Sequence, residues 1–192
     1  MTSARPRFRE DKTTQAAAVL IDLAGGEINY LVLLKLLYLA DRAALTQMGQ
    51  LITLDRHVSM NKGPVPSTTY DLLKGTAAPG YGQYWNKHIS RPESYAVTII
   101  APASTDKLSD AEIDVLRETY AQYGHIPWSA FPGLCHRILP EWRHPHGSSA
   151  PIEYEEILRA VLEDEADVEA IRAELDLMAY VDELLAEETV QR

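Results

Sequence analysis

The chain has 192 residues, of which 46% are hydrophobic and 8% aromatic, and its 18 basic and 28 acidic side chains give a net charge of −10. This composition is typical of a soluble globular protein of one domain, or of one domain with an appendage, and no apolar run reaches the roughly 18 residues that a membrane span needs. The single Cys135 cannot form an internal disulfide and the start of the chain lacks the apolar stretch of a signal peptide, so we expect a cytoplasmic protein.

The charge is distributed unevenly along the chain. Residues 151–192 hold 14 acidic and 3 basic side chains, whereas residues 1–150 hold 14 acidic and 15 basic ones. An acidic surface repels phosphate, which disfavours nucleic acid as a partner of the tail and favours a basic protein. The alternative is that acidic helices only keep the chain soluble.

The predicted elements begin after a flexible arm at residues 1–11, which has no periodic apolar pattern. A first helix is predicted over 13–24, where Gly25 and Gly26 end it. A second helix, over 28–48, is apolar around almost its whole circumference, which predicts a central helix buried on several sides. One polar stripe on this helix is expected to face water, and it consists of Lys35, Arg42 and Thr46.

Asp41 lies on the apolar side of the central helix, where an unpaired carboxylate is strongly destabilising. We therefore expect a partner for it, and a structural role in which it pins the following segment onto the helix. The candidate partners in that segment are Arg56, His57, Lys62 and the hydroxyl of Tyr70. No second carboxylate or nucleophile lies at a recognisable spacing, which disfavours a catalytic role.

The middle of the chain predicts short elements. An extended segment over 56–60 precedes residues 63–66, whose glycine and two prolines predict a turn. A short helix to residue 73 follows, and Gly75 ends it. Residues 95–100 have the β-branched character of a strand, with 85–89 as a candidate hairpin partner.

The remaining elements are predicted to be helical. Ser109 and Glu112 form a capping box at the start of a helix that ends at Gly124. Further helices are predicted over 128–138, from 151 to 161 and from about 167 onward, the last with acidic positions around an apolar face of Val168, Ile171, Leu175, Met178 and Leu185. The fold class is therefore mainly α: a compact helical domain around a buried central helix, with a small two- to three-stranded antiparallel sheet.

Two alternative functions depend on a few polar residues. A small metal or thiol enzyme would use Cys135 together with His125, His136, His144 and His146. Cys135 and His136 are adjacent, however, and point about 100° apart on a helix, unlike the paired ligands of structural zinc sites. We favour Cys135 as a core residue and His136 as a helix-end residue that caps carbonyls, and we predict no metal or cofactor.

A DNA-binding autoregulator is another alternative. Its phosphate contacts would come from the arginine-rich arm, through Arg5, Arg7 and Arg9. No helix shows a basic face of three or more lysines or arginines, and the acidic composition opposes this function.

Four segments, in order, resemble the Panacea domain, a SocA-like, phage-associated antitoxin family. They are KLLYLADR at 35–42, DRHVSMNKGPVPSTTYDLL at 55–73, LSDAEIDVLRETYAQYG at 108–124 and HRILPEWRHP at 136–145. The resemblance covers roughly residues 13–160. Carried over position by position, the motif residues, most of which we interpret as scaffold, are Lys35, Tyr38, Asp41, Gly63, Pro64, Val65, Tyr70, His136 and Trp142.

The resemblance implies a non-enzymatic protein with a toxin as its partner. It would be the antitoxin of a bacterial or prophage type II toxin–antitoxin pair and would neutralise its toxin by direct contact. A variant of this function is a proteolytic adaptor that delivers the toxin to a Clp protease. Association of the chain into a homo-oligomer is compatible with either function. The domain would span 12–162, leaving an acidic helical extension over 163–192. That extension holds the candidate residues for binding a basic toxin surface: Glu169, Glu174, Asp176 and Asp182.

Overall fold

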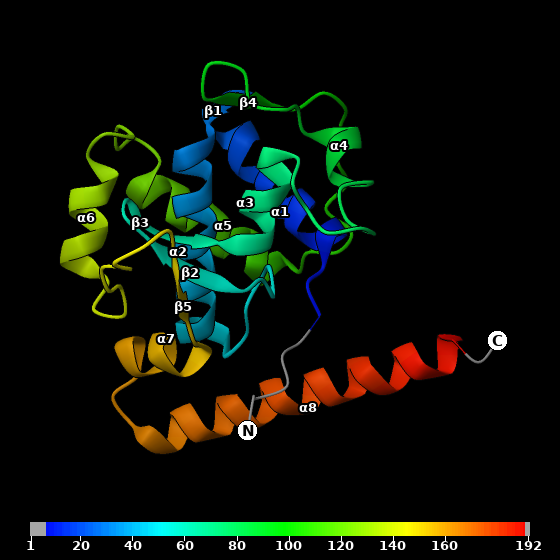
Figure 1. The fold of residues 1–192 in the computed structure, drawn as a ribbon, viewed down its shortest axis with the longest axis vertical. Coiled ribbons are helices and arrows are strands. Elements are labelled where there is room, and N and C mark those ends of the chain that lie inside the picture. The colour runs from blue at the N-terminus through cyan, green and yellow to red at the C-terminus, as the bar shows by residue number, and fades with distance from the viewer. Residues whose placement is uncertain (1–6, 191–192) are drawn as a thin grey trace.

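The structure is a computed structural model that describes residues 7–190, with side chains through residue 185 (Figure 1). Its elements in chain order are α1 (Glu10–Leu23), β1 (Glu27–Asn29), α2 (Tyr30–Met48), β2 (His57–Met60), β3 (Gly63–Pro66), α3 (Ser67–Lys74), α4 (Trp85–His88), β4 (Ala96–Thr98), α5 (Asp110–Tyr123), α6 (Phe131–Ile138), β5 (Ala150–Ile152), α7 (Tyr154–Val161) and α8 (Glu165–Val190). The mainly helical fold with small antiparallel sheets confirms the predicted class.

Helix α2 is the centre of the fold, as its apolar circumference predicts. It packs against α1, α5, α7 and β3, and its leucines at 33, 34, 36, 37 and 45 are fully buried. Burial of a leucine side chain contributes about 1.5–3 kcal/mol, so this helix supplies a large part of the core. Gly49, in the left-handed conformation with φ 66°, ends α2, and Asn29 caps its start by accepting the N–H of Leu31.

The strands form two separate antiparallel sheets. One pairs β1 with β4, and the other has the order β3-β2-β5. The prediction of a turn at 63–66 is wrong, because these residues form β3, in register with β2 through Val58 and Val65. Since β3 is an edge strand of its sheet, its two prolines are tolerated there.

The prediction of a hairpin partner over 85–89 holds only at its end, where Ile89 forms an antiparallel bridge with Ile99. Trp85–His88 is the short helix α4, and β4 pairs instead with β1, with Ile28 opposite Val97. The carboxylate of Glu10 on α1 explains the difference, because it accepts the N–H groups of Gly82, Tyr84 and Trp85 at 2.8 Å each. These donors would be orphans at the start of a helix, and Glu10 satisfies them.

The start of the described chain lies against helix α8. Of the arm expected at 1–11, residues 1–6 lie outside the described residues, whereas Phe8 is buried edge-to-face against Tyr81. The backbone N–H of Arg7 donates to Asp182 of α8 at 2.9 Å. Helix α8 begins at Glu165 and runs along one side of the body, past which its C-terminal end projects (Figure 1).

Other boundaries also differ from the predicted ones. Helix α6 starts at Phe131 rather than near 128, and Pro151 lies within strand β5, so α7 starts only at Tyr154. The capping box of Ser109 and Glu112 is present at the start of α5, as predicted. Across the described residues, we find no helix with the length and apolar character required to cross a membrane.

Candidate functional site

The loop after α2 is buried, and Asp41 satisfies its backbone. Residues 51–55 are all buried, and a buried loop needs partners for its N–H groups. Oδ1 of Asp41 accepts the N–H groups of Ile52 and Thr53 at 2.9 Å each, and Oδ2 accepts the hydroxyl of Thr53. Asp41 therefore joins this loop to the central helix through both of its carboxylate oxygens.

His57 completes this arrangement. Its Nε2 lies 3.0 Å from Oδ2 of Asp41, so one of the four predicted partners is correct. Among the described residues its Nδ1 meets no hydrogen-bond partner, which favours the tautomer that carries the proton on Nε2. The ring also packs edge-to-face on Tyr38 at 5.1 Å between centroids, and the side chain is therefore held on two sides.

A second buried carboxylate joins the central helix to the loop after α6. Oε1 of Glu141 accepts both the hydroxyl of Tyr38 and Nε of Arg42, each at 2.9 Å. Burial and the neighbouring Glu141 raise the pKa of Tyr38 well above its ordinary value, so this hydroxyl remains a donor. The expectation that Arg42 faces water is therefore only partly met, because Arg42 is half-buried in an ion pair.

Lys35 contradicts the predicted water-facing stripe more clearly than Arg42 does. Only 4% of Lys35 is exposed, and its ammonium donates to the carbonyl of Pro64 at 2.7 Å. Strand β3 covers this face of α2, which a helical pattern alone does not reveal. Thr46 is exposed as expected, so the stripe faces water at only one of its three positions.

Gly63 lies where the backbone of β3 passes closest to its neighbours. Its φ is +96°, and a Cβ at this position would stand 2.9 Å from Cβ of Cys135 and 3.3 Å from Nζ of Lys35. A side chain is thus excluded both by backbone conformation and by space. Gly63 and Pro64 of one motif segment, Lys35 of another, and Cys135 of α6 converge at one point.

The buried ammonium should make stability depend on pH. Burial lowers the pKa of Lys35 from 10.5 to about 8, so the folded state binds this proton less tightly than the unfolded chain does. The buried charge of Lys35 lowers the free energy of unfolding fully at pH values below 8. This destabilisation declines as the pH rises from 8 toward 10.5. The free energy of unfolding of the wild type, relative to Lys35→Met, should therefore rise by about 1 kcal/mol between about pH 6.5 and pH 9.

Urea unfolding of both proteins at the two pH values measures this change. The subtraction cancels the titrating groups that do not interact with Lys35. Cys135 does interact with it, since burial raises the pKa of its thiol and the Lys35 ammonium lowers it, so Cys135→Ala is introduced into both proteins. A difference between the two proteins that stays constant with pH would contradict the assignment.

The cysteine and histidine residues do not form a metal site. Within residues 7–185, no three side chains of His, Cys, Asp or Glu are placed to hold a metal ion. Cys135 is buried as predicted, and burial raises the pKa of its thiol, the opposite of what a nucleophile needs. His136 stacks on Trp142 at 3.7 Å between ring centroids rather than capping carbonyls, and Nε1 of Trp142 donates to the carbonyl of Met60.

A pocket of about 360 Å³ opens beside this convergence point. It lies between the start of α2, the turn from β2 to β3 and the start of α6, and three motif residues line it: Lys35, Val65 and Tyr70. Its wall also includes four further aromatic residues, Tyr30, Tyr95, Trp128 and Phe131. Tyr30 and Tyr95 stack at 5.9 Å, and the ammonium of Lys62 lies over the ring of Trp128.

Helix α8 carries the four candidate partner-binding residues. Glu169 and Glu174 are exposed, Asp176 is half-buried, and Asp182 accepts the N–H of Arg7. The body-facing side of the helix is made by Val168, Leu175 and Ala179, all buried. Met178 and Leu185, which the apolar pattern places near this side, are exposed.

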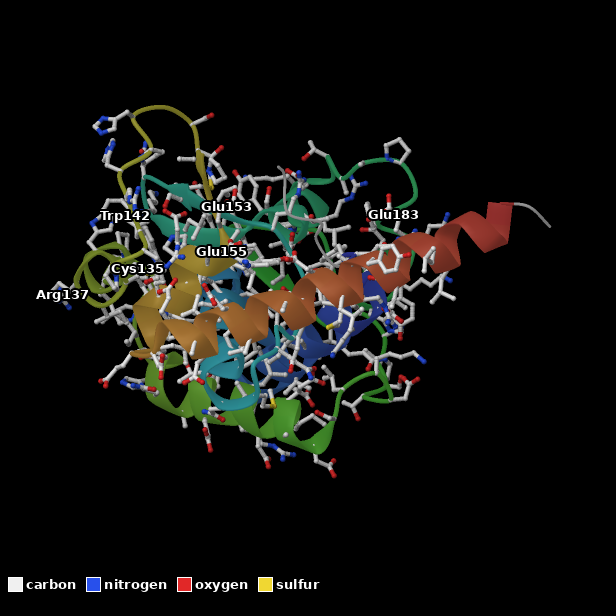
Figure 2. All side chains as sticks on the ribbon, turned by 90° about the horizontal axis from the view of Figure 1, so that it is seen from below. Cys135, Arg137, Trp142, Glu153, Glu155 and Glu183 are labelled. Atoms are coloured by element: carbon white, nitrogen blue, oxygen red, sulfur yellow. The ribbon has the colours of Figure 1, made fainter. Side chains whose placement is uncertain are left out.

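The opposite side of α8 is a second apolar face. Leu177, Tyr180, Val181 and Leu184 follow the spacing of three and four residues that brings side chains onto one stripe, and each is 44–61% exposed. At 100° per residue this exposed stripe lies about half a turn away from the packed side. Figure 2, seen from below, shows α8 lying across the body, with Glu183 on its projecting part. Sequence reasoning missed this stripe, although its spacing was visible.

The fold and the site define a mainly helical protein in which Asp41, Lys35 and Glu141 join separate segments through buried contacts. A family model described as Antitoxin SocA-like, Panacea domain matches residues 33–143, and the chain belongs to this family. No curated protein and no solved structure gives a match. The family span ends before α7 and α8, so the exposed stripe lies outside it.

Proposed function

We propose that this protein is the antitoxin of a bacterial or prophage type II toxin–antitoxin pair and neutralises its toxin by direct binding through α8. The family supports an antitoxin role. The observation that carries the proposal is the exposed stripe, because a helix that packs on one side and shows leucine, tyrosine and valine on the other fits the groove of a partner.

The charges on α8 indicate the kind of surface that the toxin presents. Residues 165–190 hold nine acidic and one basic side chain. Acidic side chains around an apolar stripe are complementary to an apolar groove with basic residues at its rim. A toxin that acts on RNA or nucleotides has a basic site of this kind, and we propose that α8 covers it.

Co-expression with the product of the neighbouring gene tests the proposal. The wild type should restore growth, whereas the triple variant Leu177→Ser, Tyr180→Ala, Leu184→Ser should not, because it removes the apolar anchors and leaves the packed side intact. Ile100→Ser is the matched control, since Ile100 is also exposed, at 57%, but lies next to β4. A toxin that stays lethal beside the wild type, or a triple variant that still neutralises it, would refute the proposal. Toxin abundance in the same cells distinguishes neutralisation from delivery to a protease.

Charge reversal on α8 should slow association with the toxin. Lysine substituted at Glu169, Glu174 and Asp176 replaces attraction with repulsion, and we expect the association rate constant to fall about tenfold at low salt, with a smaller change in dissociation. Stopped-flow measurements at two salt concentrations give both constants. The control reverses the same number of charges on α5, at Asp110, Asp114 and Glu118, all exposed. An equal effect of both triple variants would indicate that only the net charge matters.

A further inference from the structure

The pocket beside Lys35 has a charge opposite to that of the protein. The chain has a net charge of −10, yet the described residues that line this pocket include two lysines and no acidic residue. Lys62 is exposed and lies over the ring of Trp128, whereas Lys35 is 96% buried, given its 4% exposure. The pocket therefore attracts an anion.

Lys35 lacks the counter-ion that a buried ammonium normally has. Its one hydrogen bond within the described chain goes to the carbonyl of Pro64, and no carboxylate of residues 7–185 lies within ion-pair distance of it. Buried charges in proteins are almost always paired, because the unpaired charge loses its hydration without compensation. An anionic group brought in by a ligand would supply the missing partner.

The walls of the pocket specify the rest of the ligand. Tyr30, Tyr70, Tyr95 and Trp128 present ring faces and edges, and Val65 and Phe131 add apolar surface. The volume of about 360 Å³ is at the lower end of the range for small-molecule sites. A flat apolar body fits such walls, and one buried ammonium matches a single carboxylate rather than a phosphate with its higher charge.

From these observations we propose that the pocket binds a small carboxylic acid with an aromatic or similarly flat apolar body. Its carboxylate pairs with the ammonium of Lys35, and its ring lies against Tyr95 and Trp128. The site is independent of the proposed function, because the pocket lies at the α6 and β1–β4 side of the body, away from α8 (Figure 1).

Titration of the purified full chain with 3-phenylpropionate tests this site by calorimetry. For a ligand of this size we expect a Kd on the order of 1 mM or below. The matched probe 3-phenylpropionamide, which has the same shape without the charge, should bind at least about tenfold more weakly. In amide NMR spectra the indole N–H signal of Trp128 should shift on binding and that of buried Trp85 should not.

Three variants identify the groups that bind. Lys35→Met should weaken binding of 3-phenylpropionate by about tenfold or more, whereas Lys87→Met, an exposed lysine on α4, should leave it unchanged. Lys62 lies on the exposed turn between β2 and β3, and Lys62→Met should weaken binding of 3-phenylpropionate about threefold. This variant tests the proposal even if Lys35→Met fails to fold. No binding at about 10 mM, or equal binding of acid and amide, would overturn the proposal. Tighter binding of a peptide that ends in phenylalanine would overturn it in favour of a protein C-terminus.

Discussion

Asp41→Ala should lower the free energy of unfolding by about 3–5 kcal/mol. The substitution leaves two buried N–H groups, the hydroxyl of Thr53 and Nε2 of His57 without their acceptor. Since the total stability of a domain is about 5–15 kcal/mol, this variant is expected to be close to unfolded. Urea denaturation followed by circular dichroism measures the loss.

Two further variants make this prediction decisive. Asp41→Asn keeps the volume and one acceptor oxygen, so it should fold and lose about 2 kcal/mol. Asp114→Ala removes an exposed aspartate whose ion pair within the described part of the chain is with Arg117, and should change stability by less than about 0.5 kcal/mol. If Asp41→Asn were as stable as the wild type, the pinning role assigned to this carboxylate would be wrong.

Gly63→Ala should have the second large effect and lower the free energy of unfolding by about 3 kcal/mol. Gly26 offers a matched control, because it has the same φ of +96° but no atom within 4 Å of an added Cβ. Gly26→Ala should therefore show the backbone strain alone, about 1 kcal/mol, whereas Gly63→Ala adds the clash with Cys135.

Thermal and urea unfolding of the two alanine variants give this difference directly. The clash also displaces Lys35 or Cys135, so Gly63→Ala should weaken binding of 3-phenylpropionate in addition. Equal losses of stability at the two glycines would show that the contact with Cys135 relaxes without cost.

Local features of this fold could be predicted from the sequence. The capping box of Ser109 and Glu112 involves neighbours in the chain, and the apolar circumference of residues 30–48 requires burial wherever the other elements lie. Asp41 was predictable for the same reason, since a carboxylate on that face must be paired. His57 was among its expected partners, whereas the N–H groups of Ile52 and Thr53 were not.

Features that depend on distant contacts could not be predicted. The pairing of Ile28 with Val97 joins segments far apart in the chain, and the strand propensity of 95–100 does not say which partner it will find. The helical pattern of the sequence indicates a solvent-facing side chain for Lys35, whereas in the fold its ammonium donates to the carbonyl of Pro64. Glu141, likewise, gives no signal beyond its position before Trp142, although it holds both Tyr38 and Arg42.

The contact between Arg7 and Asp182 bears on how this protein should be handled. The chain meets α8 at Arg7, and α8 is the last described helix, so a purification tag or fluorescent protein at either terminus is attached close in sequence to a residue of α8 or to its contact with Arg7. Such a fusion could block neutralisation and be mistaken for loss of function. The exposed face of α5, for example at Asp114, is a better place for a label, since it lies outside α8 and outside the pocket beside Lys35.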